Sequence, residues 1–139
     1  MNHWPHPILT RRDAALLIEE RGVLVAGDML SDVLIPMLDW NSTNDPIEDY
    51  LIGLRLLEGV ADDVDVIIPG HGSVGGADQV GARIEQDRAY MQALRDGSGP
   101  DDPRIGPSVK PGWEWVSDVH AGQTQRLLAQ RIERDATPG

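Results

Sequence analysis

Short apolar runs separated by turn residues predict strands in the first half of the chain. Residues 14–18 and 23–26 are two such runs, and the polar segment between them contains Gly22. Two apolar runs around a glycine-containing turn are typical of a hairpin whose strands are both largely buried. A third run, residues 64–68, ends in a Pro-Gly-His-Gly sequence and predicts a further strand.

Apolar residues at helical spacing predict three helices farther along the chain. The first has a well-marked start, because Asp45 can be the N-cap and Pro46 occupies the first helical position. Glu48 lies where a capping box has an acid, and Gly59 is a suitable end for this helix. The other two helices are expected over residues 77–95 and 117–134.

The resulting order, β-β-α-β-α-α, indicates a mixed α/β class with helices against a sheet. Residues 1–12 show no clear period, so we expect an irregular N-terminal arm followed by one domain over residues 13–139. Residues 29–44 and 97–112 are expected to be long loops, the latter because it holds several glycines and prolines.

Composition narrows the classes of protein that this chain can be. With 139 residues, 40% hydrophobic and 25% charged, it is long enough and apolar enough for one folded domain. A net charge of −11 argues against nucleic acid and anionic membranes as partners, because both would repel it. Cysteine is absent, which excludes disulfides and thiolate metal sites. No segment is typical of a signal peptide or a membrane span, so we expect a soluble cytoplasmic protein.

Two strand ends carry the residues best suited to chemistry. Asp28 follows Gly27 at the end of one predicted strand, and His71 lies between Gly70 and Gly72 at the end of another. Side chains at such ends commonly project into a crevice in layered α/β proteins. A carboxylate and a neutral imidazole are suitable ligands for zinc, manganese or iron. The alternative is a pair of ordinary turn residues, each hydrogen-bonded locally.

The order of these motifs resembles the second half of the metallo-β-lactamase superfamily. Residues 23–28 (VLVAGD) and 66–72 (VIIPGHG) are separated by a single capped helix, and the likeness covers residues 14–96. In that superfamily a strand-end Gly-Asp supplies a carboxylate that bridges two metals, and the Pro-Gly-His-Gly turn supplies a histidine to the second metal. The resemblance therefore implies that Asp28 and His71 are metal ligands.

The resemblance also implies a fold and a reaction. The fold would be half of an αββα sandwich, with one sheet and flanking helices. The cofactor would be zinc, or manganese or iron, with two ions in the complete family site. A metal-held water or hydroxide would attack a small-molecule ester, thioester, lactone or amide, because the metal lowers the pKa of the water and polarises the bond under attack.

This sequence departs from the family pattern in its first half. The His-x-His-x-Asp-His signature, which builds most of the first metal site, is absent. A further family histidine would align near residues 8–10, where this chain has Leu9. Position by position, only Asp28 and His71 are carried over, whereas a working zinc site usually has three protein ligands and one open position.

Three further histidines are candidate replacement ligands, each with a simpler alternative. His3 and His6 could reach the site from the arm, but such residues commonly belong to a flexible terminus. His120, near the start of the last predicted helix, could instead pack against a loop. Three tryptophans could line a substrate pocket or fill the core. They are Trp40, Trp113 and Trp115.

These observations favour a metal-dependent hydrolase of this superfamily, either truncated or degenerate, with an incomplete metal site. The alternative is a non-catalytic binding or dimerisation module that keeps the scaffold. Half of a two-sheet sandwich leaves a sheet face and a strand edge uncovered, so we expect a homodimer or pairing with a complementary half. In a third interpretation the two turns are coincidental features of an unrelated α/β domain.

Overall fold

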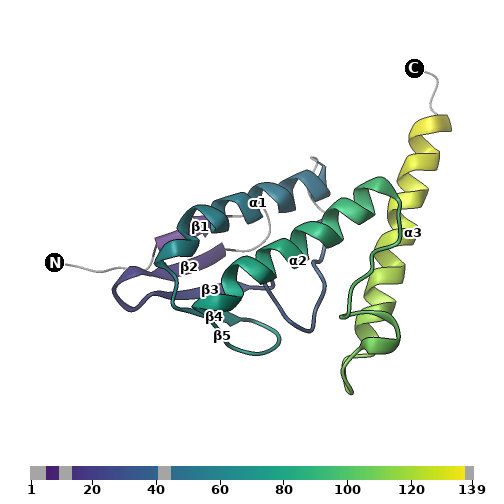
Figure 1. Cartoon of the computed structure of the whole chain (residues 1–139). Coiled ribbons are helices and arrows are strands. Elements are labelled where there is room, and N and C mark those ends of the chain that lie inside the picture. Colours follow the sequence, from purple (N-terminus) through teal and green to yellow (C-terminus); the bar gives the residue numbers. More distant parts are fainter. Residues whose placement is uncertain (1–5, 10–13, 41–44, 137–139) are drawn as a thin grey trace.

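A computed structural model of the chain describes residues 6–9, 14–40 and 45–136. Its centre is a five-stranded sheet in the order β1-β2-β3-β4-β5 (Figure 1). The strands are β1 (His6–Leu9), β2 (Ala14–Ile18), β3 (Val23–Gly27), β4 (Val66–Pro69) and β5 (Gly75–Gly76). The helices are α1 (Pro46–Val60), α2 (Ala77–Asp96) and α3 (Trp115–Ala136). Short 3-10 turns lie between β2 and β3, after α1, and in the loop between α2 and α3.

One parallel pair in the sheet determines where the candidate site lies. Strands β1, β2 and β3 run antiparallel to one another in sequence order, whereas β3 and β4 are parallel neighbours. Parallel neighbours need a crossover connection, which the long loop after β3 and helix α1 supply. The carboxyl ends of β3 and β4 therefore lie at the same edge of the sheet.

Two strands were not expected from the sequence. Residues 6–9 pair with β2, so the expectation of an irregular arm over residues 1–12 is wrong for this segment. The prediction failed because β1 is defined by its hydrogen-bonding neighbour and not by an apolar period of its own. Strand β5 consists of two glycines beside β4, and glycine contributes nothing to a hydrophobic pattern.

Helix α1 begins as the sequence predicts. The Asp45 carboxylate accepts hydrogen bonds from the backbone N–H groups of Ile47 and Glu48, at 2.9 and 3.3 Å. The Glu48 side chain does not complete the expected capping box, because its carboxylate accepts instead from Arg55 and Arg95. The sequence therefore located the start of α1 correctly. It assigned the wrong partner to Glu48, which binds two arginines and not the backbone of the cap.

The two faces of the sheet differ in how they are covered. Helices α1 and α2 lie across one face, and the apolar core is between them and the sheet (Figure 1). On the other face Leu16, Val25 and Ile68 form a row across β2, β3 and β4, and Leu16 and Ile68 are exposed. The side chains that point into the core are those of Ala15, Leu17, Leu24, Ala26 and Ile67. The mixed α/β class, with one sheet and flanking helices, is thus confirmed.

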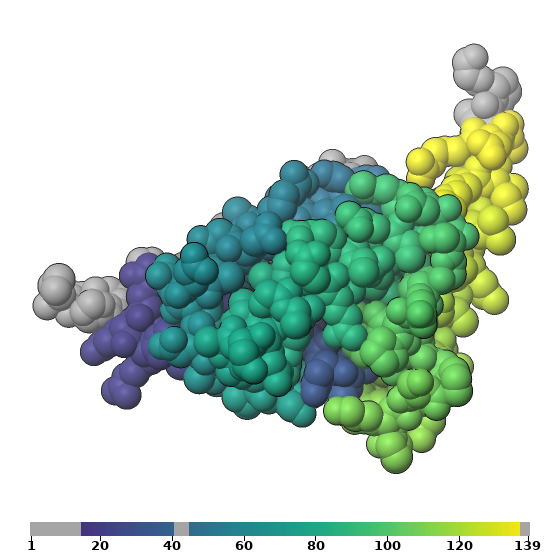
Figure 2. Space-filling view, in the orientation of Figure 1, coloured from purple at the N-terminus to yellow at the C-terminus, as the bar shows by residue number. Residues whose placement is uncertain are grey.

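Gln123 in the first half of helix α3 and Arg131 in its second half attach this helix to the rest of the molecule. Gln123 accepts the Leu38 N–H at 2.7 Å and donates to the Pro36 carbonyl at 3.0 Å, which ties α3 to the loop that follows β3. The last turns of α3 project beyond the body of the molecule (Figure 2). In the described part of the chain no helix combines the length and the apolar character needed to cross a membrane.

Candidate metal centre

Asp28 and His71 lie side by side at the carboxyl edge of the parallel pair. Asp28 directly follows β3, and His71 follows β4 after Gly70. The distance from His71 Nδ1 to Asp28 Oδ1 is 3.5 Å, and the two side chains are 45% and 33% exposed. Two residues that are 43 positions apart in the sequence (71 − 28) are thus neighbours in space, as the strand-end pattern predicts. That they bind a metal remains a prediction.

Close contact between the two strand ends depends on glycine. The Gly70 N–H donates to the Gly27 carbonyl at 2.6 Å, and a side chain at Gly70 would lie only 3.0 Å from that oxygen. Gly27 itself has a φ of 58°, a left-handed conformation that side chains rarely adopt. The glycines beside Asp28 and His71 therefore allow the two backbones to approach each other.

Ser31 and Asp32, in the loop after β3, hold the turn that carries His71. The Ser31 hydroxyl donates to the His71 carbonyl at 2.8 Å, and its oxygen accepts two backbone N–H groups of its own turn. The Asp32 carboxylate accepts the Ser73 N–H at 2.8 Å. The backbone of the turn that carries His71 is thus held at two points by the loop after β3.

Asp32 also adds negative charge near the pair. Burial alone would raise the pKa of Asp32, but the hydrogen bonds from Ser73 and the charges of Arg83 and Lys110 outweigh burial and hold that pKa below its usual value. The carboxylate therefore stays ionised at neutral pH, and Lys110 Nζ lies 3.6 Å from its Oδ2.

The backbone after Asp28 is strained and is held by two buried charges. Leu30 has a φ of 58°, although it is not a glycine. Its N–H donates to Asp87 at 3.0 Å, and its carbonyl accepts from Arg83 at 3.1 Å. Arg83 also donates to the Ser73 carbonyl at 2.9 Å, so one guanidinium joins the loops that carry Asp28 and His71. A left-handed non-glycine residue costs on the order of 1–3 kcal/mol and persists where its surroundings fix it.

Beneath these loops lies a buried ion-pair network centred on Arg104. Its guanidinium pairs with Asp102 through two nitrogens and with Asp87 at 2.6 Å, and it also donates to the Ser31 carbonyl at 3.0 Å. Burial alone would lower the pKa of Arg104, but the two carboxylates outweigh burial and raise it. The guanidinium is therefore charged and fixes the loop after β3 from below.

An aromatic pair borders His71. The Trp113 ring meets the His71 ring edge-on at a centroid distance of 6.3 Å, and Trp115 lies 5.6 Å from Trp113. Trp40 is engaged elsewhere, since Arg126 stacks over its ring at 4.6 Å. Of the three tryptophans considered from the sequence, Trp113 and Trp115 adjoin the candidate site and Trp40 packs with α3.

Of the three additional histidines, only the side chain of His120 is described, and it does not join Asp28 and His71. His120 Nδ1 is hydrogen-bonded to the Tyr90 hydroxyl at 2.8 Å, and its ring lines a separate pocket between α2 and α3. Burial lowers the pKa of His120. His3 lies outside the described residues, and of His6 only the backbone, in β1, is described. No group of three or more His, Cys, Asp or Glu side chains suited to a metal exists within the described residues.

Asp28 and His71 nevertheless fit two positions around one ion. Zinc bonds of about 2.0–2.1 Å to nitrogen and oxygen, at a tetrahedral angle, place the two ligand atoms roughly 3.4 Å apart. The observed separation of 3.5 Å agrees with this value. The pair therefore fits half of a tetrahedral site, and the described residues supply no third ligand.

The residues that support this pair could not be found by sequence reasoning. Ser31, Arg83 and Arg104 act on partners 40, 53 and 73 positions away. No local motif marks a contact at such a separation. Only the folded chain identifies these side chains as part of the site.

Comparisons with known proteins bear on the fold. No family model matches the chain, and no curated protein matches it. Among solved structures, the stereoselective inverting sec-alkylsulfatase from Pseudomonas sp. has a TM-score of 0.52 and 18% identity, over 67% of this chain and 16% of the sulfatase. A metallo-β-lactamase family protein from Thermus thermophilus has a TM-score of 0.48 and 26% identity, over 90% of this chain and 41% of that protein.

The chain thus spans less than half the length of either structure. At 18% identity, the likeness to the alkylsulfatase concerns the fold alone. That fold is the one implied by the two strand-end motifs, and they occur here in the expected order with their side chains in contact. The chain has part of the metallo-β-lactamase fold.

Proposed function

We propose that this chain is the metal-binding carboxy-terminal part of a metal-dependent hydrolase, and that Asp28 and His71 are two of the metal ligands. The observation that carries the proposal is the 3.5 Å separation of their ligand atoms at the carboxyl edge of two parallel strands. The substrate class is a small ester, thioester, lactone or amide, and zinc, manganese or iron suits this ligand pair.

The roles of the chain's own residues follow from their positions. Asp28 and His71 provide an oxygen and a nitrogen ligand, and Ser31 holds the turn that orients the imidazole. The Trp113 ring lies beside the His71 ring in a T-shaped arrangement, at a centroid distance of 6.3 Å. When bound, a divalent ion would lower the pKa of a water molecule and polarise the bond to be hydrolysed.

The remaining ligands are proposed to come from a polypeptide segment that covers the open face of the sheet. The row formed by Leu16, Val25 and Ile68 supports this, because a partly exposed apolar row at a sheet face is typical of a surface that packs against another element. Without such a segment, we expect this face to pair with a second copy of the chain.

Cobalt binding tests the ligand pair directly. Bound Co²⁺ is expected to quench tryptophan fluorescence, because the Trp113 ring centroid lies 6.3 Å from the His71 ring. His71→Ala and Asp28→Ala should each weaken the apparent affinity by about tenfold or more, since two ligands are already few. His120→Ala is the matched control and should leave the titration unchanged. Equal quenching in all three variants would show that cobalt binds elsewhere.

Light scattering tests the proposed covering of the sheet face. The isolated chain is expected to form dimers at high concentration. Ile68→Lys should return it to a monomer, because dimer formation would bury the charge of the new lysine in the apolar row. Ile52→Lys is the control, since Ile52 is 45% exposed on α1 and Ile68 is 39% exposed on β4. A stable monomer at every concentration would contradict this part of the proposal.

A further inference from the structure

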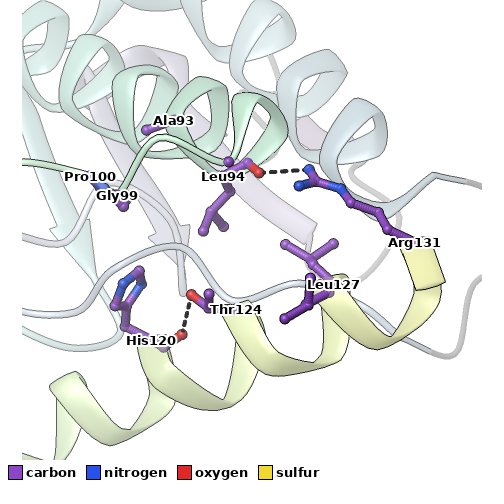
Figure 3. Close-up of a pocket in the computed structure, with 10 residues that line it drawn as sticks. Ala93, Leu94, Gly99, Pro100, His120, Thr124, Leu127 and Arg131 are labelled. Atoms are coloured by element: carbon purple, nitrogen blue, oxygen red, sulfur yellow. Dashed lines mark hydrogen bonds between the residues drawn. The ribbon is translucent and has the colours of Figure 1, made fainter.

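A pocket separate from the metal centre lies between the end of α2 and helix α3. Its volume is about 280 Å³, and Figure 3 shows Leu94 of α2 facing Leu127 of α3 across it. Pro100 and Leu128 add further apolar wall. Small-molecule sites are commonly about 300–1,000 Å³, so this pocket suits a ligand at the small end of that range.

At one end of the pocket, His120 presents a single hydrogen-bond donor. Gln123 has a fixed orientation, because its oxygen accepts the Leu38 N–H, and its amide nitrogen therefore donates to the Tyr90 hydroxyl at 3.0 Å. The Tyr90 proton is then available for His120 Nδ1, at 2.8 Å. With Tyr90 as the donor to Nδ1, the neutral ring has its own proton on Nε2, which has no partner among the described residues.

At the other end, Arg131 presents a fixed cation (Figure 3). Its Nη2 donates to the carbonyls of Leu94 and Arg95, at 3.0 and 2.7 Å, which anchors the guanidinium on the last turn of α2. Both hydrogens of Nη2 are thereby used. The Nε and Nη1 hydrogens have no partner in the described part of the chain and can serve a ligand.

Among the described residues Arg131 forms no ion pair, so its charge is available to an anion although the chain as a whole is acidic. Arg95, Arg134 and Asp45 line the adjoining depression together with Arg131, and Arg95 is already paired with Glu48 at 2.6 Å. Local groups dominate the potential that a bound ligand experiences, because more distant charges are screened by salt. A carboxylate on Arg131 would gain charge-assisted hydrogen bonds, and an alkyl chain would bury itself against the leucines.

We propose that this pocket binds a short aliphatic monocarboxylate. The carboxylate accepts hydrogen bonds from Arg131, and the chain lies between Leu94 and Leu127 and extends toward His120. This is a binding site apart from Asp28 and His71, and it does not depend on a metal or on the proposed hydrolysis.

Calorimetric titration with octanoate and with octanamide tests the site. Wild-type protein is expected to bind octanoate about tenfold more tightly than the neutral amide, and Arg131→Gln should abolish this preference. Leu128→Glu should weaken octanoate binding by about tenfold or more, because it adds a like charge to the pocket wall.

Ile132→Glu is the matched control for the added charge. Leu128 and Ile132 are one helical turn apart and similarly exposed, at 56% and 61%, but only Leu128 lines the pocket. Octanoate affinity should therefore be much lower in the first variant than in the second. The proposal is wrong if octanoate gives no saturable binding, if octanamide binds equally well, or if both glutamate variants bind like the wild type.

Discussion

Replacing Arg104 with methionine is expected to lower the free energy of unfolding by about 3–5 kcal/mol, the usual cost of removing one partner from a buried ion pair. The Arg104, Asp87 and Asp102 side chains are almost wholly buried and hydrogen-bonded to one another. Methionine fills similar space but leaves two carboxylates without their cation and the Ser31 carbonyl without a donor. Urea denaturation of the variant and the wild type measures the difference.

Arg55→Met is the matched control for this substitution. Arg55 pairs with Glu48 on the exposed surface of α1. Exposed ion pairs contribute about 0–1 kcal/mol, so the same change of residue type should there have little effect. If the two variants lost similar stability, the buried network would not be the cause.

The decrease in the free energy of unfolding of the Arg104→Met variant should also depend on pH. Burial raises the pKa of Asp87, and the Arg104 charge and the hydrogen bonds from Leu30 and Tyr50 oppose that rise. Without Arg104 the pKa in the folded state rises further above the unfolded value of about 3.9. A carboxyl group with a raised folded pKa contributes stability that is present below the unfolded pKa and is lost as pH rises through the folded pKa.

The stability deficit of the variant relative to the wild type is therefore expected to be smaller at about pH 4 than at about pH 7. Urea denaturation at both pH values provides the comparison. Equal deficits would mean that the Asp87 pKa does not rise when the guanidinium is removed.

Gly72→Ala is expected to be the most damaging substitution of a glycine in the His71 turn. Gly72 has a φ of 99°, and an added Cβ would collide with the Asp32 carboxylate and lie 3.1 Å from Ser31 Oγ. Asp32 cannot move aside without losing its hydrogen bond to the Ser73 N–H. We expect a loss of about 1–3 kcal/mol from strain at this conformation. Thermal or urea denaturation measures this loss.

The same substitution should displace His71 from Asp28, because Ser31 and Asp32 hold the turn on which His71 lies. The cobalt affinity of Gly72→Ala should therefore fall together with stability. Gly81→Ala is the control, since Gly81 lies in the second turn of α2 with nothing within 4 Å of an added Cβ. Alanine there should stabilise the helix by about 0.5–1 kcal/mol. Unchanged cobalt binding in Gly72→Ala would show that the turn does not position the ligand.

The ligand variants and the Arg104 variant test two different roles: metal binding and support of the loops that carry the site. Asp28 and His71 at the sheet edge are the proposed ligand pair, whereas Ser31, Arg83 and Arg104 hold the loops on which the pair depends. Loss of a ligand should weaken cobalt binding by about tenfold or more with little change in stability. Loss of Arg104 should reduce stability first and disturb the site only as a consequence.

The sequence pattern predicts the parts of the fold that are determined locally. Apolar runs place β2 and β3, and the Asp45-Pro46 start places α1 within one residue, because hydrogen bonding and packing within each segment leave a period or a cap in the sequence. Strand β1 and the glycine strand β5 have no such period or cap in the sequence, because both are defined only by the neighbouring strands to which they hydrogen-bond.

By itself the sequence placed Asp28 and His71 at the ends of two apolar strands, and the resemblance of this motif order to the metallo-β-lactamase superfamily implied that the two side chains meet. Only the tertiary structure decided what supports them, because the buried arginines join segments up to 73 residues apart and such contacts leave no periodicity. The tertiary structure also shows that His120, a candidate ligand from the sequence, lines another pocket. The sequence could not show this, because the packing of α3 against α2 follows from side-chain fit across the whole molecule.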